Sequence, residues 1–168
     1  MIITETDRLI LREFHASDAE DMFHLNADPD VIRYTHNLPF KSISEAREFI
    51  LNYTHYKDYG FGRWAVINKS DNSWLGWCGL KYTPDIDEYD IGFRFFKKYW
   101  NKGYATESAL ASIDVGFNRL KIPTIIGRAM SQNTASIRVL EKIGLVFMKK
   151  FDFEGEEGVM YKMDNPLM

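Results

Sequence analysis

The sequence predicts a mixed α+β domain, and three observations lead to this fold class. Three segments between residues 64 and 96 have the apolar runs or alternation of β-strands. Two helical segments then alternate with strands, and the C-terminal part reads as two strands joined by an acidic turn. This order differs from the regular strand–helix repeat of a parallel α/β sheet. Because no linker or change in composition divides the chain, we predict a single domain over residues 1–168.

The first third of the chain predicts one short strand and two helices. Leu9–Leu11 is a strand flanked by arginines. The capping-box spacing of Ser17-Asp18-Ala19-Glu20 predicts a helix start, and Asp28-Pro29-Asp30 ends that helix because proline disfavours its continuation. A second capping box, Ser42-Ile43-Ser44-Glu45, begins the next helix, for which Gly60 is the expected stop.

The rest of the chain predicts six strands and two helices. The strands are expected at Trp64–Ile67, Trp74–Leu80, Tyr89–Phe96, Thr124–Ala129, Leu145–Phe153 and Gly158–Met163. Residues 69–73 read as the turn between the first two. One helix spans roughly Thr106–Asn118, and a shorter one runs from Asn133 to Gly144. The longer helix has an apolar face made of Ala109, Leu110, Ile113 and Phe117.

The loop at residues 100–105, Trp-Asn-Lys-Gly-Tyr-Ala, joins a predicted strand to a predicted helix. Backbone N–H groups and the helix dipole favour an anion at such a junction, and Gly103 lets the main chain approach a phosphate closely. Lys102 adds a cation at the rim. The loop lacks the Gly-Lys-Ser/Thr ending of a nucleoside-triphosphate P-loop and the G-x-G-x-x-G of a dinucleotide site. Alone, it is equally compatible with a glycine that simply permits the turn.

Composition excludes several classes of protein. A net charge of −3 argues against a general nucleic-acid binder. Cys78 is the only cysteine, and the four histidines lack ligand spacing, so we expect neither an internal disulfide nor a metal site. No segment approaches the ~18 apolar residues of a membrane span, and the first residues lack the features of a signal peptide. We therefore expect a cytoplasmic protein that binds neither nucleic acid directly nor membranes.

Three motifs occur in an order and at separations that are typical of one family. They are T-D-R-L-I-L-R at Thr6–Arg12, Y-W-x-K-G-Y-A-T-E at Tyr99–Glu107, and N-x-x-S-I-R-V-L-E-K-x-G at Asn133–Gly144. Together they resemble the GCN5-related N-acetyltransferase (GNAT) superfamily, in its branch of RimJ/RimL-like ribosomal-protein N-terminal acetyltransferases. Gly103 and Ala105 fill the last two marked positions of the family signature Q/R-x-x-G-x-G/A. Trp100 stands where Gln or Arg is usual.

The resemblance implies a GNAT acyl-CoA N-acyltransferase fold, with a central, mixed, mostly antiparallel twisted sheet flanked by about four helices. It also implies acetyl-CoA as cosubstrate and no metal. The pyrophosphate would lie on the 100–105 loop, the pantetheine arm would pair with the backbone of the preceding strand, and an asparagine would bind the arm. The implied cofactor-binding residues are Phe93, Phe95, Trp100, Asn101, Lys102, Gly103, Tyr104, Ala105 and Asn133. Asn133 could equally serve as a helix N-cap, or do both.

A general base is needed because an alkylammonium must lose a proton before it attacks a thioester. Glu88 and Asp90 share one face of the key strand, and many family members carry an acid there. We favour Asp90 slightly, although both could be solvated carboxylates at a strand end. The acidic turn at residues 154–157 is a second candidate group.

A general acid for the departing thiolate is less evident. Many family members use a tyrosine seven residues after the asparagine, and here that position is Leu140. Ser136 lies one helical turn beyond Asn133 and is the candidate substitute, by hydrogen bonding to the sulfur or by proton donation. Its alternative role is that of an ordinary serine in the first turn of a helix.

The resemblance therefore implies an acetyl-CoA-dependent N-acetyltransferase, an acyltransferase of the EC 2.3.1 class. The acetyl group would pass to a primary amine by direct attack in a ternary complex, without an acetylated Cys78. The acceptor could be a protein N-terminus or a small molecule, and the protein a monomer or homodimer. The alternative is a catalytically weak or inactive acyl-CoA-binding sensor, a reading to which the missing tyrosine gives some weight.

Overall fold

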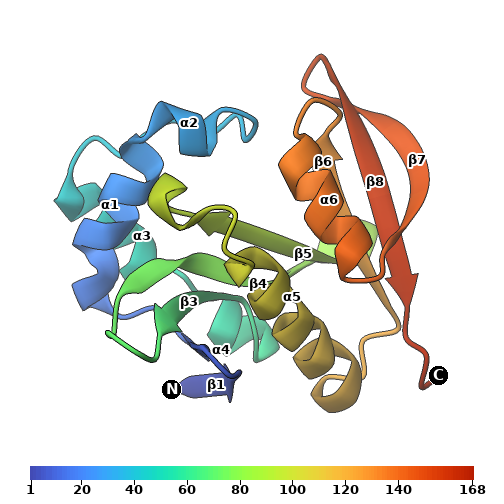
Figure 1. Ribbon diagram of the computed structural model, residues 1–168, viewed down its shortest axis with the longest axis horizontal. Helices are drawn as coiled ribbons and strands as arrows, with labels where there is room; N and C mark the ends of the chain where they lie inside the picture. The colour runs from blue at the N-terminus through green and yellow to red at the C-terminus, as the bar shows by residue number, and fades with distance from the viewer.

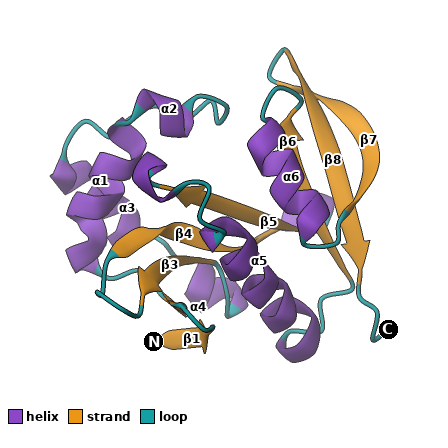
Figure 2. Cartoon of the chain, in the orientation of Figure 1, coloured by secondary structure: helices purple, strands orange, loops and turns teal.

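Eight strands form one twisted sheet in the computed structural model, which describes residues 1–168 (Figures 1 and 2). The strands are β1 (Ile2–Glu5), β2 (Leu9–Arg12), β3 (Arg63–Asn68), β4 (Trp74–Thr83), β5 (Glu88–Phe95), β6 (Thr124–Met130), β7 (Val146–Phe153) and β8 (Glu156–Asp164). Their order across the sheet is β1-β2-β3-β4-β5-β6-β8-β7. All neighbours are antiparallel except β5 and β6, which are parallel, so the expected mixed, mostly antiparallel sheet is confirmed.

The parallel pair β5–β6 divides the sheet into two halves. These strands pair only from Tyr89 opposite Ile125 to Ile91 opposite Gly127. Beyond that point β5 stays paired with β4 as far as Phe95, whereas β6 stays paired with β8. The two strands therefore diverge, and Figure 1 shows them separating toward the side where α2 and the β7–β8 turn lie. The divergence leaves one backbone edge of β5 without a strand partner.

Six α-helices flank the sheet. They are α1 (Ala19–Ala27), α2 (Pro29–Ile32), α3 (Ile43–Leu51), α4 (His55–Tyr59), α5 (Tyr104–Asp114) and α6 (Thr134–Lys142). The four longer ones, α1, α3, α5 and α6, match the expected number, and a π-helical turn (Val115–Arg119) extends α5. No helix has both the length and the apolar character that crossing a membrane requires.

Two apolar cores lie on opposite faces of the sheet. The larger core packs α5 against β3, β4 and β5 through residues such as Trp64, Leu80 and Ile113. The smaller core packs α1 and α3 against the other face through residues such as Met22 and Ile50. Because side chains alternate along a strand, neighbouring residues of β5 contact different layers.

Three local predictions were wrong. The 17–20 capping box does not form: a 3-10 turn begins at Ala16, and the Asp18 carboxylate instead accepts two bonds from Arg12, of 2.8 and 2.9 Å. The expected helix from Ser42 to Gly60 is broken after Leu51, where the chain turns so that Tyr53 and Tyr56 both reach β3. Leu110 is 47% exposed, because it lies beside the buried stripe of α5 and not on it.

Strand β1 was not expected from the sequence. It is short, its two end residues are exposed, and its pairing with β2 has an irregular register. Such an edge strand carries little of the apolar alternation on which strand prediction depends.

Candidate active site

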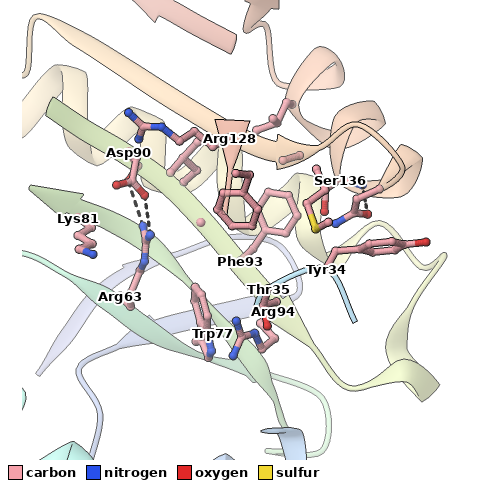
Figure 3. A pocket seen from close by; sticks show the side chains of 17 residues that line it. Tyr34, Thr35, Arg63, Trp77, Lys81, Asp90, Phe93, Arg94, Arg128 and Ser136 are labelled. Atoms are coloured by element: carbon pink, nitrogen blue, oxygen red, sulfur yellow. Dashed lines mark hydrogen bonds and ion pairs between the residues drawn. The ribbon is translucent and has the colours of Figure 1, made fainter. Parts of the chain in front are cut away.

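A cleft of about 290 Å³ occupies the opening between β5 and β6 (Figure 3). Its walls are Gly92–Arg94 of β5 and Arg128–Met130 of β6, and Tyr34, Thr35 and Phe153 lie at its margin. Four of the residues singled out from the sequence line it: Asp90, Phe93, Asn133 and Ser136. The divergence of two strands thus brings together side chains that are up to 46 positions apart in the chain.

The 100–105 loop leads from the end of β5 into α5 and has the geometry of an anion site. Gly103 is the N-cap of α5 with φ +80°, and Asn101 is also left-handed with φ +61°. The N–H groups of the first helical turn have no carbonyl partner within the helix, and they point with the positive end of the helix dipole. A Cβ on Gly103 would be strained by the backbone and would meet the Arg8 guanidinium at 3.3 Å. The residues present fit a pyrophosphate.

The N-terminal motif fixes this loop, a role that sequence reasoning missed. Thr6 Oγ1 donates to Glu107 Oε2 (2.6 Å), and Arg8 Nε donates to Glu107 Oε1 (2.8 Å). Arg8 Nη1 also donates to the Lys102 carbonyl (3.0 Å), so one side chain holds both the loop and the first turn of α5. Burial by itself would raise the pKa of Glu107, but the hydrogen bonds from Thr6 and Arg8 lower it below its ordinary value. The signal that could have revealed this contact is the presence of both the Thr6–Arg12 and the Tyr99–Glu107 motifs in one chain.

The open edge of β5 presents backbone groups to the cleft. The indole N–H of Trp100 donates to the Phe95 carbonyl (2.9 Å), so this carbonyl faces away from β4. Alternate residues of an antiparallel strand direct their backbone groups the same way, and Phe93 therefore presents its N–H and C=O to the opening. Phe93 also lines the cleft, whereas the Phe95 side chain is buried in the larger core. Trp100 thus occupies the carbonyl of Phe95, whereas the backbone N–H and C=O of Phe93 remain free.

Helix α6 begins at the opposite wall of the cleft. The Asn133 side-chain carbonyl accepts from the Ser136 backbone N–H (3.2 Å), which makes Asn133 the N-cap of the helix. Its amide nitrogen makes no hydrogen bond within the chain, so it can still donate to a ligand in the cleft. Leu140 also lines the cleft and is 1% exposed. An apolar residue at that position cannot supply a proton.

Asp90 forms an ion pair with Arg63 on the cleft wall (Figure 3). Arg63 Nη2 lies 2.6 Å from Asp90 Oδ1, and Arg63 Nη1 donates to the carbonyls of Gly79 and Asp90 (2.8 and 3.0 Å). Arg63 starts on β3 and crosses the backbone of Gly79 and Gly92, which pair with each other across β4 and β5. A Cβ on Gly92 would come within 2.7 Å of the guanidinium. Asp90 Oδ2 has no partner within the chain.

Glu88 lies outside the cleft. Both of its carboxylate oxygens accept from Arg128 Nη2, at 2.7 and 2.6 Å. Although Glu88 and Asp90 share a strand face as expected, the two carboxylates pair with different arginines. Of the two candidate bases, only Asp90 borders the space that a substrate would fill.

Arg94 was not anticipated from the sequence, although it lines the cleft. Its Nη1 donates to Asn26 Oδ1 (2.5 Å) and its Nη2 to Asn37 Oδ1 (2.8 Å). The Trp77 ring lies 5.2 Å from the guanidinium carbon. Burial, and then the positive charge of Arg63, lower the pKa of Arg94 to about 10, so the group stays charged at neutral pH.

The acidic turn contacts the segment after α2 beside the cleft. Glu154 Oε2 lies 3.2 Å from His36 Nδ1, and the His36 ring contacts the Phe153 ring edge-on with centroids 4.9 Å apart. These contacts join the segment after α2 to the β7–β8 hairpin. Glu157 is engaged elsewhere, by Ser131 (2.8 Å) and Lys150 (3.6 Å).

Cys78 is fully buried in the larger core, where its sulfur contacts Ser112 Oγ at 3.6 Å. Burial raises the pKa of this thiol. A buried, protonated thiol is a poor nucleophile.

No group of three or more His, Cys, Asp or Glu side chains lies together as metal ligands do.

Comparison with known proteins gives consistent matches. A family model described as the acetyltransferase (GNAT) domain matches residues 8–146. The chain is 35% identical over 148 residues to YkkB of Bacillus subtilis, an uncharacterised protein, covering 86% of this chain and 85% of the other. It is also similar to a GNAT-family acetyltransferase of Bacillus anthracis, whose crystal structure superposes with a TM-score of 0.84 at 30% identity over 98% of this chain and 99% of that one.

A more distant structure shares the fold alone. RimL, a ribosomal L7/L12 alpha-N-protein acetyltransferase solved in complex with coenzyme A, superposes with a TM-score of 0.84 at 17% identity. The match covers 98% of each chain.

Proposed function

The chain belongs to the GNAT acetyltransferase family, and we propose that it transfers the acetyl group of acetyl-CoA to a primary amine by direct attack in a ternary complex. The observation that carries this proposal is the divergence of β5 from β6. It opens a cleft whose wall is an unpaired strand edge, beside a helix N-terminus suited to a pyrophosphate. Acetyl-CoA would lie with its phosphates on the 100–105 loop and its arm along Phe93.

The reaction assigns a role to each wall of the cleft. The amine nitrogen attacks the thioester carbonyl carbon, a C–N bond forms, the C–S bond breaks, and coenzyme A leaves as a thiolate, which takes up the proton that the nitrogen releases as the amide forms. The proton of the incoming ammonium passes to Asp90, whose Oδ2 is free to accept it directly or through water. Ser136, at the start of α6, would hydrogen-bond the departing sulfur, because Leu140 cannot. The Asn133 amide would hold the pantetheine arm while its carbonyl caps the helix.

Release of free thiol from acetyl-CoA tests the proposal. A panel of peptides with free N-termini, amino acids, amino sugars and polyamines should contain acceptors that release thiol well above the rate of acetyl-CoA alone. Mass spectrometry should find each active acceptor heavier by one acetyl group. Tight coenzyme A binding without turnover on any acceptor would contradict the proposal and favour an acyl-CoA sensor. Activity that labels the protein covalently would contradict direct attack.

A further inference from the structure

We infer that the acceptor is a small amine that carries an anionic group, a carboxylate or a phosphate, and that Arg94 binds this group. The inference rests on the proposed acetyl transfer and narrows its acceptor. It excludes a polyamine, whose cationic groups would meet an arginine instead of an acid in this part of the cleft.

The charges in the cleft do not cancel. Its lining contains four cationic side chains and one carboxylate: Arg63, Lys81, Arg94, Arg128 and Asp90. Arg63 is neutralised by Asp90 at 2.6 Å, and Arg128 by Glu88 at 2.6 Å. Arg94 forms no ion pair at all, and neither does the exposed Lys81. The cleft therefore retains positive charge after its internal pairs are counted.

Arg94 is held in place without being neutralised. Both groups that accept its hydrogen bonds are amide carbonyls, from Asn26 of α1 and Asn37 after α2. Asn26 is itself 5% exposed, and its amide donates to the Met22 carbonyl, so it is fixed in turn. Aspartates there would cancel the charge, whereas asparagines orient the guanidinium and leave its remaining N–H donors free. A half-buried, oriented, uncompensated cation on a cleft wall favours an anion strongly.

The anion in question is not a phosphate of coenzyme A. Arg94 bonds to Asn26 of α1 and so faces the layer of α1 and α3, whereas the 100–105 loop enters α5 on the opposite layer. Figure 3 shows Arg94 beside Trp77 on one side of the Phe93 strand, with Ser136 on the other. The proposed reaction places the thioester between these two sides, which leaves Arg94 on the side of the acceptor.

The size and cover of the cleft favour a small acceptor. Its volume is about 290 Å³, and the contacting pair His36 and Glu154 directly follows the lining residues Thr35 and Phe153. An amino acid or an aminoalkyl phosphate is small enough for a cleft of this volume, whereas a peptide would extend beyond it. The short distance from the nitrogen to the acid group in such molecules would set the amine over the strand edge while Arg94 holds the anion.

Matched pairs of acceptors test the inference on the unaltered protein. We would compare the twenty amino acids with their carboxamides, and phosphoethanolamine with ethanolamine, by thiol release. Anionic members should have kcat/KM values at least about tenfold above those of their neutral partners, the usual scale for a charge-assisted hydrogen bond. Because carboxylate pairs and phosphate pairs are measured separately, the comparison shows which acid group is bound. Faster turnover of the carboxamides, of spermidine, or of a tripeptide than of every free acid would overturn the inference.

Variants identify the residue responsible. Arg94→Gln should abolish the preference within a pair, mainly by raising KM for the anionic member. Arg94→Lys should restore part of the preference. Lys98→Gln is the matched control, because it removes one exposed positive charge four residues along the chain without lining the cleft. Equal preference in the Arg94→Gln and parent proteins would overturn the assignment to Arg94.

The two proposals fail in different ways. If the neutral amines are acetylated best, acetyl transfer stands and the anionic acceptor does not. If nothing in the panel is acetylated, the proposed function fails, and calorimetric titration of the same pairs into the protein with coenzyme A present still decides the inference. Selective binding of the anionic members would support it, and equal or undetectable binding of both members would overturn it.

Discussion

Gly103 and Gly60 have nearly the same left-handed backbone, with φ of 80° and 81°, but only Gly103 lies in the loop that begins α5. Gly103→Ala should weaken coenzyme A binding by at least about tenfold, because the added Cβ strains the turn and occupies the approach to the phosphates. Titration calorimetry of the folded variant measures this loss.

Gly60→Ala is the control for backbone strain. Its Cβ would meet no atom within 4 Å, so it carries the same unfavourable conformation without touching the site. We expect a similar loss of thermal stability from both variants and a loss of affinity from Gly103→Ala alone. Equal affinity in the two variants would place the phosphates elsewhere.

The roles of Asp90 and Glu88 can be distinguished by replacing each carboxylate with the corresponding amide. Asp90→Asn keeps an acceptor for Arg63 but removes the proposed base, so kcat should fall by ~10²–10⁴-fold. Glu88→Gln removes an equal charge outside the cleft and should change kcat less than about tenfold. Steady-state kinetics with one active acceptor decides between them. A larger loss in Glu88→Gln would reverse the assignment, and small losses in both would direct attention to residues 154–157.

At the scale of elements, the contact between the β1–β2 connection and α5 links stability to pH. Glu107 accepts from Thr6 and Arg8, and these bonds lower its pKa. Because the pKa of Glu107 is lower in the folded protein than in the unfolded chain, its ionised carboxylate stabilises the fold at pH values above the unfolded-state pKa. This stabilisation is lost as the pH falls through the folded-state pKa. Glu107→Gln should therefore reduce the free energy of unfolding by about 1 kcal/mol at pH 7.

The difference between Glu107→Gln and the parent should shrink below pH 4.5, the ordinary value for this group, and vanish at lower pH. Urea unfolding at a series of pH values measures it. Glu48→Gln is the control, since Glu48 is an exposed carboxylate on α3 without an ion pair, and it should show no such trend. A difference independent of pH would mean that Glu107 contributes through packing and not through its charge.

Most strands and the longer helices were predicted from the sequence to within a few residues. Strand β3 was expected at Trp64–Ile67 and runs from Arg63 to Asn68, because its apolar run is buried almost throughout. The position of the first helix start was predicted but its cap was not, because Asp18, and not Ser17, accepts a hydrogen bond from the backbone N–H of His15 and also pairs with Arg12. The break between α3 and α4 depends on hydrogen bonds to β3 that no local pattern reveals.

At the scale of the whole molecule, the two halves of the sheet meet over a short stretch of β5 and β6. A ligand arm that pairs with the open edge of β5 would add hydrogen bonds where the sheet is interrupted. With coenzyme A at ~100 times its dissociation constant, amide exchange at Phe93 and in residues 101–105 should slow by about two orders of magnitude.

Hydrogen exchange read by mass spectrometry or NMR measures this protection. Strand β1 lies at the far edge of the sheet and provides the internal control, since its exchange should not change. Uniform protection of both regions would indicate general stabilisation and not pairing at β5. Protection confined to the loop would mean that the arm does not follow the strand.

The sequence by itself determined the fold class, the family and the place of the glycine loop, because apolar alternation, helix caps and motif spacing are local properties of the chain. It also named Asp90, Asn133 and Ser136, which the tertiary structure brings to one cleft. Only the tertiary structure decided that Arg63 and Arg128 form ion pairs with the two candidate carboxylates. It also decided that Arg94 is held by two asparagines and forms no ion pair with a carboxylate. Asn26 and Arg94 are 68 residues apart, and α1 brings them together by packing on the sheet. Charge compensation depends on such distances in space, which residue order does not contain.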